Sequence, residues 1–288
     1  MKPAPFDYVM ATSVADVVNH LAEDEREVKV LAGGQSLVPV LNMRLARPQV
    51  LVDITRVSDL QTISLAPDGA LRIGAAVRQT DALEHPLVRR DWPAVASAIR
   101  HIGHPQIRNS GTVCGSLAHA DSSAELPAVA VLLDARIQVL SPRGSREVRA
   151  ADFFLGTFTT DLEPDELVTA VHFPPSPAGT RHDVSEFTQR RGDFATVGVA
   201  TRAARHADRL SEARIVFFGV GGTPVRVPTI EDVLVGSDPT TTDWAAIATA
   251  LAEVLAPPTD VHASSELRLE LAATLLQRSV LSAWELCR

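Results

Sequence analysis

Two short glycine-rich segments constrain this chain more than any other feature of its sequence. The first glycine segment is Ala32-Gly33-Gly34-Gln35-Ser36, and the second is Gly111-Thr112-Val113-Cys114-Gly115-Ser116. Glycine permits positive φ and leaves no side chain between the backbone N–H groups and a ligand. Consecutive exposed N–H groups in such a turn form a concave site for phosphate oxygens. Two such turns, each ending in a serine hydroxyl, predict a ligand whose diphosphate lies between two loops.

The composition limits the classes of function. Of the 288 residues, 45% are hydrophobic and 22% are charged, which is typical of a globular protein with a large core. The net charge of −8 argues against nucleic-acid binding, which requires a basic face. The two cysteines, Cys114 and Cys287, are too few for an iron–sulfur cluster or a disulfide framework. The sequence lacks the patterns of a signal peptide and of a membrane span, so we expect a cytoplasmic protein.

The N-terminal part of the chain alternates between helical and extended patterns, as in a small α/β unit. Ser13, followed by Asp16, predicts the N-cap of the first helix. Ser122 and Glu125 predict a capping box for a later helix. The elements expected up to residue 173 are strands over 28–31, 50–54 and 167–173, helices over 14–23, 37–45, 80–84, 92–101 and 125–133, and hairpins over 62–77 and 136–150.

The segment Pro174-Pro175-Ser176-Pro177-Ala178-Gly179 is the best candidate for a linker. The patterns that follow it predict strands over 183–188, 196–203 and 213–219, and helices over 244–254 and 265–284. These elements indicate an α+β protein with two or three subdomains.

Three polar groups of residues allow more than one interpretation. Residues 103–111 form a polar, irregular segment, which is either a functional loop or a connection whose polar groups satisfy one another. Asp121 and Glu125 either cap a helix and offset its dipole, or accept hydrogen bonds from ribose or ribityl hydroxyls. Asp193, in Arg190-Arg191-Gly192-Asp193, lies either in a turn between strands or at the edge of a bound ring.

Several standard motifs are absent. The dinucleotide fingerprint G-x-G-x-x-G and the phosphate-binding loop G-x-x-x-x-G-K-[ST] do not occur. Gly219-Val220-Gly221-Gly222 is followed by residues that favour an extended chain, so we interpret it as a turn at a strand end. His101, His104 and His119 fit no standard metal spacing, and no metal site is expected. No Ser-His-Asp or paired-carboxylate arrangement can be recognised either.

Four blocks of this sequence resemble the FAD-binding medium subunit of the molybdenum hydroxylases. The blocks are residues 32–37, 107–112, 115–121 and 191–195. The family includes the medium subunits of carbon monoxide dehydrogenase, quinoline oxidoreductase and nicotine dehydrogenase, and the flavin domain of xanthine dehydrogenase.

The resemblance covers the whole chain and implies its domains. It implies a two-subdomain FAD-binding fold of the vanillyl-alcohol-oxidase (PCMH) type over residues 1–176, with subdomains of about 1–57 and 58–176. A C-terminal α+β domain of the carbon monoxide dehydrogenase flavoprotein type follows over residues 177–288.

The resemblance implies a site for non-covalently bound FAD. The two glycine segments would wrap the diphosphate of the FAD. Ile102 matches a position near the adenine, Glu125 one near the ribityl chain and Val168 one near the isoalloxazine, and Asp193 matches a carboxylate close to the flavin. The residues expected at the site are Lys29, Val30, Leu31, Ala32, Gly33, Gly34, Gln35, Ser36, Ile102, Gly111, Thr112, Cys114, Gly115, Ser116, Asp121, Glu125, Val168 and Asp193.

Cys114 departs from the family pattern, because the family usually has the first glycine of a pair at this position. A positive φ would strain a cysteine there. We expect instead an ordinary backbone, with the thiol filling a small space.

The resemblance implies an electron-transfer role without a catalytic residue or a metal on this chain. A large partner subunit would carry molybdopterin and hydroxylate the substrate, and a small partner subunit would carry two 2Fe–2S clusters. The FAD would pass their electrons to an external acceptor, within a dimer of heterotrimers. Two alternatives are a stand-alone flavoprotein reductase of the same FAD fold and a flavin-free assembly protein.

Overall fold

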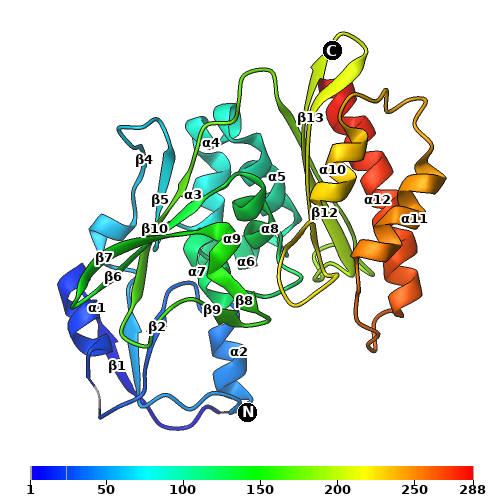
Figure 1. Ribbon diagram of the computed structural model, residues 1–288. Coiled ribbons are helices and arrows are strands. Elements are labelled where there is room, and N and C mark those ends of the chain that lie inside the picture. Colours follow the sequence, from blue (N-terminus) through cyan, green and yellow to red (C-terminus); the bar gives the residue numbers. More distant parts are fainter. Residues whose placement is uncertain (1, 24, 288) are drawn as a thin grey trace.

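The computed structural model describes residues 2–23 and 25–287. Its main parts are layers of sheet and helix that stack side by side (Figure 1). One layer of helices lies between the sheet around β10 (Leu167–Phe173) and the sheet around β12 (Val197–His206). A second set of helices covers the other face of the β12 sheet.

The first sheet is small and parallel, with β3 (Val50–Asp53) between β1 (Asp7–Met10) and β2 (Val28–Leu31). Every residue of β3 is buried, as expected of the central strand in a parallel sheet. The strands predicted over 28–31 and 50–54 are confirmed, whereas β1 is not among the predicted strands.

Two short helices flank these strands. α1 (Val14–Leu21) begins at Ser13, and the side chains and N–H groups of Ser13 and Asp16 bond reciprocally, so the predicted cap is confirmed. α2 (Leu37–Asn42) ends earlier than predicted, because the chain turns out of the helix and reaches a φ of 59° at Arg44.

The second sheet is antiparallel and contains both hairpins that the sequence predicts. β10 lies at its centre, and all of its residues are buried. Val171 of β10 lies opposite Ile73 on one side and Ile137 on the other, in a continuous apolar row. The strand order is β4 (Ile63–Leu65), β5 (Leu71–Gly74), β10, β6 (Arg136–Ser141) and β7 (Gly144–Arg149).

The helical layer corrects three expectations. Residues 103–111 are not irregular, because Pro105 begins a short helix there. The second glycine segment is not a turn, since it forms the start of another helix, for which Thr112 is the N-cap. The Ser122 capping box does not form, because the helix at Glu125 has Ala124 as its N-cap. The helices of this layer are α3 (Gln79–Glu84), α4 (Pro86–Asp91), α5 (Pro93–His101), α6 (Pro105–Ser110), α7 (Val113–His119) and α8 (Glu125–Leu132).

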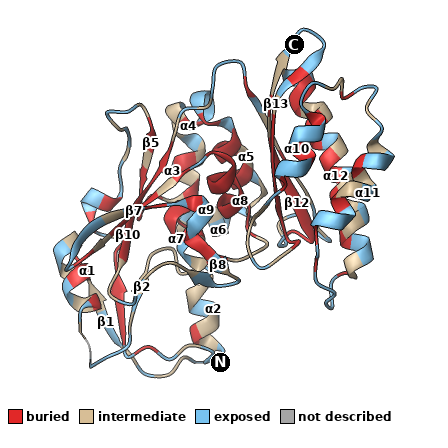
Figure 2. Ribbon diagram, viewed as in Figure 1, coloured by how far each residue is buried: buried red, intermediate tan, exposed pale blue. Residues whose placement is uncertain are grey.

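The C-terminal part is an antiparallel sheet covered by helices on both faces. α8 and α5 pack on its inner face and α12 on its outer face, which leaves α8 buried on every side (Figure 2). Its strands are β11 (Arg181–Phe187), β12, β13 (Arg209–Phe218) and β14 (Val225–Arg226), and its outer helices are α10 (Pro228–Leu234), α11 (Trp244–Val254) and α12 (Ser265–Leu286).

The two faces of this sheet belong to two different cores. On β13, Val216 and Phe218 pack into the core shared with the helical layer, whereas Ile215 and Phe217 pack against the outer helices. Successive residues of a strand point to opposite faces, so burial on both faces explains the unbroken apolar run. The remaining short elements are η1 (Ser58–Leu60), α9 (Ala150–Phe153), β8 (Phe154–Gly156) and β9 (Thr159–Thr160). No helix in the described part of the chain is both long enough and apolar enough to span a membrane.

Candidate functional site

A cavity of about 480 Å³ lies where the glycine segments meet the helical layer. Both glycine segments line it, together with residues from the start of α8, the start of β10 and the loop between β11 and β12. Segments far apart in the sequence therefore share one concave surface.

The first glycine segment connects β2 to α2 and presents backbone N–H donors to the cavity. Gly34 has a φ of +70°, a conformation that L side chains rarely adopt. Among residues 2–23 and 25–287, no acceptor takes a hydrogen bond from the N–H groups of Gly33, Gly34, Gln35 or Ser36. These donors lie in the cavity wall, as the sequence predicts for a phosphate-binding turn.

The two glycine segments are in direct contact. A Cβ on Gly33 would lie 2.6 Å from Gly111 Cα and 2.6 Å from Ser110 O, closer than real Cβ contacts. Gly33 is therefore required for close approach of two backbones, and its φ is not positive. The contact fixes the distance between the loops that the sequence assigns to one ligand.

The second glycine segment is held by the N-cap of α7. Thr112 Oγ1 accepts a hydrogen bond from Gly115 N–H at 3.0 Å. A Cβ on Gly115 would lie 2.5 Å from this oxygen, so glycine is needed beside the cap. Cys114 is helical and buried, which confirms the ordinary backbone expected there. Burial raises the pKa of its thiol to about 12, so the thiol stays protonated.

Gln79 is a cavity residue that the sequence analysis missed. Its backbone N–H donates to Gly111 O at 2.8 Å, which ties α3 to the second glycine segment. Its side chain is buried and lines the cavity, and its Oε1 has no hydrogen-bond partner within the described ranges. An unpaired buried oxygen in a cavity wall is a ready acceptor for a ligand donor.

Asp121, between α7 and α8, and Glu125, the first residue of α8, have different roles. Asp121 does not line the cavity, and its carboxylate accepts a hydrogen bond from Ser123 N–H at 2.9 Å. Glu125 lines the cavity and is 6% exposed. Burial, followed by the nearby Glu186 carboxylate, raises the pKa of Glu125 to about 8. The structure thus separates two residues that the sequence analysis treated together.

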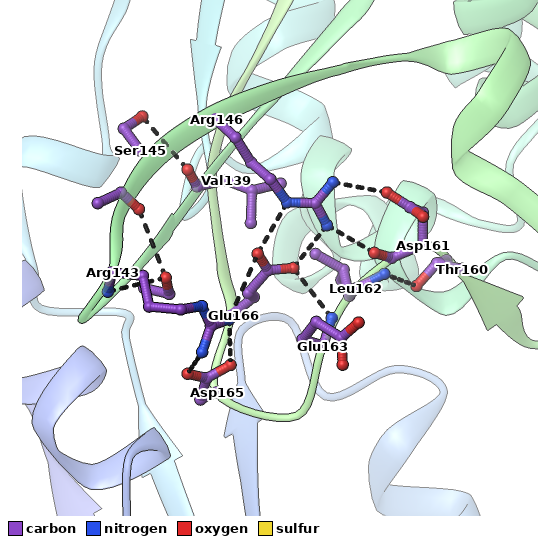
Figure 3. A network of polar contacts seen from close by, with 12 residues as sticks. Val139, Arg143, Ser145, Arg146, Thr160, Asp161, Leu162, Glu163, Asp165 and Glu166 are labelled. Atoms are coloured by element: carbon purple, nitrogen blue, oxygen red, sulfur yellow. Dashed lines mark hydrogen bonds and ion pairs between the residues drawn. The ribbon is translucent and has the colours of Figure 1, made fainter.

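A network of ion pairs supports the wall formed by the segment before β10 (Figure 3). Arg146 of β7 donates to both oxygens of Glu166, at 2.8 and 2.7 Å, and to Asp161 at 2.6 Å. Glu166 also accepts a hydrogen bond from Glu163 N–H at 2.9 Å. These bonds fix the loop that carries Leu162 and Glu166 into the cavity wall. The network keeps Glu166 ionised, because Arg146 lowers the pKa of its carboxyl.

The loop between β11 and β12 forms another wall. Gly192 has a φ of +91°, and a Cβ there would lie 2.8 Å from the His104 ring. The loop thus packs on the segment between α5 and α6 and brings Asp193 and Phe194 to the cavity. Phe194 is 64% exposed although it lines the cavity, so it lies at the mouth.

All but two of the predicted site residues line this one cavity. The exceptions are Asp121 and Leu31. The Leu31 side chain packs against Gly34, with its Cδ1 3.3 Å from the Cβ position of that glycine. The cavity is also lined by residues that are not among those predicted: Leu37, Ile54, Ala75, Gln79, Gly103, Ile107, Ala118, His119, Ala124, Leu162, Glu166, Leu167, Gly192 and Phe194. Several of these adjoin predicted residues in sequence, but Gln79, Leu162 and Glu166 belong to no motif and reach the cavity only through tertiary contacts.

Two sequence families match the chain. Residues 4–176 match the FAD binding domain in molybdopterin dehydrogenase. Residues 183–283 match the CO dehydrogenase flavoprotein C-terminal domain.

Relatives match along the full length. The 6-hydroxypseudooxynicotine dehydrogenase complex subunit alpha of Paenarthrobacter nicotinovorans is 38% identical, over 98% of this chain and 96% of its own length. The carbon monoxide dehydrogenase medium chain of Hydrogenophaga pseudoflava is 31% identical over 100% of both chains.

Solved structures agree with these matches. A chain of carbon monoxide dehydrogenase from Hydrogenophaga pseudoflava superimposes with a TM-score of 0.94 at 32% identity, covering 100% of both chains. A chain of quinoline 2-oxidoreductase from Pseudomonas putida 86 also gives 0.94, at 36% identity, covering 100% of this chain and 99% of its own. The predicted α+β fold, an FAD-binding domain followed by a flavoprotein C-terminal domain, is confirmed. The chain belongs to the FAD-binding medium subunits of the molybdenum hydroxylases, a family of oxidoreductase subunits.

Proposed function

We propose that this chain binds one FAD non-covalently in the cavity and transfers electrons from the iron–sulfur clusters of a partner subunit to an external acceptor. The contact between the two glycine segments carries this proposal. It creates one cavity wall with backbone N–H donors from the first segment and the capped start of α7 from the second. Such a wall suits the diphosphate of a dinucleotide.

The remaining walls suit the rest of an FAD molecule. Ile102 offers an apolar surface for the adenine, and Glu125 a carboxyl group for the ribityl chain. Val168, at the start of β10, offers an apolar contact for the isoalloxazine, and Asp193 a carboxylate at the mouth. Bound FAD would supply the capacity to accept single electrons and to hold two of them. The protein's share is to bind, orient and shield this group.

The electron source is proposed to be another chain. Cys114 and Cys287 are the only cysteines of the sequence, too few to ligate a 2Fe–2S cluster. We therefore assign two such clusters to a small partner subunit and the molybdopterin to a large one. A dimer of these three-subunit units and a cytoplasmic location are part of the same proposal.

The flavin content of the purified chain tests the binding step. We expect a yellow protein with one FAD per chain, and all flavin in the filtrate after denaturation. Flavin that stays with the polypeptide would contradict non-covalent binding. A colourless chain that takes up no added FAD would contradict the proposal and favour the flavin-free assembly protein.

The purified complex tests the electron-transfer step. We expect substrate to reduce the FAD only when the large and small subunits are present, and the isolated chain to hydroxylate no substrate. A chain that catalyses a complete reaction as a homo-oligomer would favour the stand-alone reductase instead.

A further inference from the structure

Three titratable side chains meet where α5, α8 and β11 come together. Glu125 begins α8, His101 ends α5, and Glu186 lies on β11. Residue Glu125 is 6% exposed, and the side chain of Glu186 is also 6% exposed. Only Glu125 lines the cavity. A buried carboxylate must be paired with a cation or be protonated. The protonation states in this cluster therefore decide whether Glu125 presents a charged or a neutral group to the cavity.

His101 and Glu186 are placed to form an ion pair. His101 Nε2 lies 3.1 Å from Val184 O, and a carbonyl only accepts, so Nε2 must carry hydrogen. His101 Nδ1 lies 3.3 Å from a Glu186 oxygen. A neutral imidazole would then face the carboxylate with a lone pair, which is repulsive. A proton between the two groups removes the repulsion, and Glu186 accordingly raises the pKa of His101.

This pairing leaves Glu125 without a cation. Its carboxyl has no hydrogen bond to another residue in the described ranges, and the charges acting on it are Glu186, His101 and Asp121. Glu186 already balances His101. The elements that pack around α8 supply no spare cation from two candidate residues. Arg214 of β13 donates a hydrogen bond to the carboxylate of Asp134, and burial lowers the pKa of His119 at the end of α7, which favours the neutral imidazole. An ionised Glu125 would therefore be a second buried anion beside a single cation.

We propose that Glu125 faces the cavity as a neutral carboxylic acid that donates a hydrogen bond to the cofactor, and that the His101–Glu186 pair keeps it neutral. This inference rests on the proposed function, because the cofactor is FAD. Bound FAD would cover Glu125 and remove its remaining water, which disfavours the carboxylate further. FAD binding therefore requires the protonated form, and affinity falls when Glu125 ionises.

FAD titration of the flavin-free full-length chain between pH 6 and pH 9 tests the linkage. With a Glu125 pKa of about 8, the Kd for FAD should rise about tenfold from pH 7 to pH 9. Glu125→Gln fixes a neutral side chain of the same shape, so its Kd should match the wild type at pH 7 and stay flat up to pH 9. Glu253→Gln, at an exposed position of α11 outside the cavity, is the matched control, and it should keep the wild-type slope. Equal slopes for the wild type and Glu125→Gln would overturn the inference.

Infrared spectroscopy of the same flavin-free chain gives an independent readout. We expect the carbonyl stretch of a protonated carboxyl group at pH 7, its loss near pH 8, and its absence in Glu125→Gln. An identical spectrum for wild type and variant at pH 7 would overturn the inference even if FAD failed to bind. Failure to bind FAD at every pH would instead overturn the proposed function, so the two failures are distinguishable.

Discussion

Replacing Gly33 with alanine should separate the two glycine segments and weaken FAD binding. The added Cβ would lie 2.6 Å from both Gly111 Cα and Ser110 O, and backbone atoms cannot rotate out of the way. Overpacking of this kind costs about 1–3 kcal/mol. The segments move apart to relieve this strain, and FAD binding must bring them together again, so the Kd should rise about 5- to 150-fold.

The assay is an FAD titration of flavin-free protein, together with thermal unfolding. Gly69→Ala is the matched control. Gly69 lies in the turn between β4 and β5 with a φ of +82°, and no atom of the described residues lies within 4 Å of its Cβ position. Alanine there should cost about 1 kcal/mol of stability through φ alone and leave FAD affinity unchanged. Wild-type affinity in Gly33→Ala would refute the reasoning, because the contact between the segments would then not shape the site.

Three further predictions concern the walls of the cavity. Cys114→Gly should leave FAD affinity nearly unchanged but lower stability by roughly 1–3 kcal/mol, because it removes a buried thiol and puts glycine in a helix; FAD titration and urea unfolding measure both, and lost FAD binding would refute it. Arg146→Gln should destabilise the loop before β10 by about 1–3 kcal/mol at pH 7. Arg146 lowers the pKa of Glu166, so this stabilisation is present above the unfolded pKa of Glu166 and should vanish as the pH falls through its folded pKa. Urea unfolding at several pH values measures it, and a loss of unfolding free energy in Arg146→Gln that is the same at every pH would refute the ion pair. Glu186 raises the pKa of His101, so their pairing stabilises the fold below the unfolded pKa of histidine and is lost as the pH rises through the folded value. In urea unfolding, the free energy of unfolding of Glu186→Gln should therefore fall furthest below the wild-type value at pH values below the unfolded pKa of histidine. A loss of unfolding free energy that grows with rising pH would contradict the pairing.

Local signals in the sequence predicted most elements of the fold. The Ser13 cap, the strand Val28–Leu31 and the helix Trp244–Val254 were predicted with correct starts, because capping and burial periodicity act within a few residues. Two expectations around the second glycine segment are wrong. The sequence predicts an irregular segment over 103–111 and a turn over 111–116, whereas Pro105 begins α6 and Gly115 makes room for the Thr112 cap of α7.

The glycine segments also located the cavity, but not every reason for their glycines. Gly34 has the positive φ that the sequence suggests, whereas Gly33 is needed for contact with Gly111, far away in sequence. Glu186, Gln79 and Glu166 could not be predicted, because each acts through a partner on another element. Such contacts depend on how the sheets and helices stack, and local sequence patterns do not predict this stacking.

A crystal structure of the chain grown with FAD tests the central claim most directly. The account predicts diphosphate density between the backbone N–H groups of residues 33–36 and the start of α7, in the cavity that Glu125 and Val168 also line. Density for FAD at another surface, with this cavity holding only water, would contradict it.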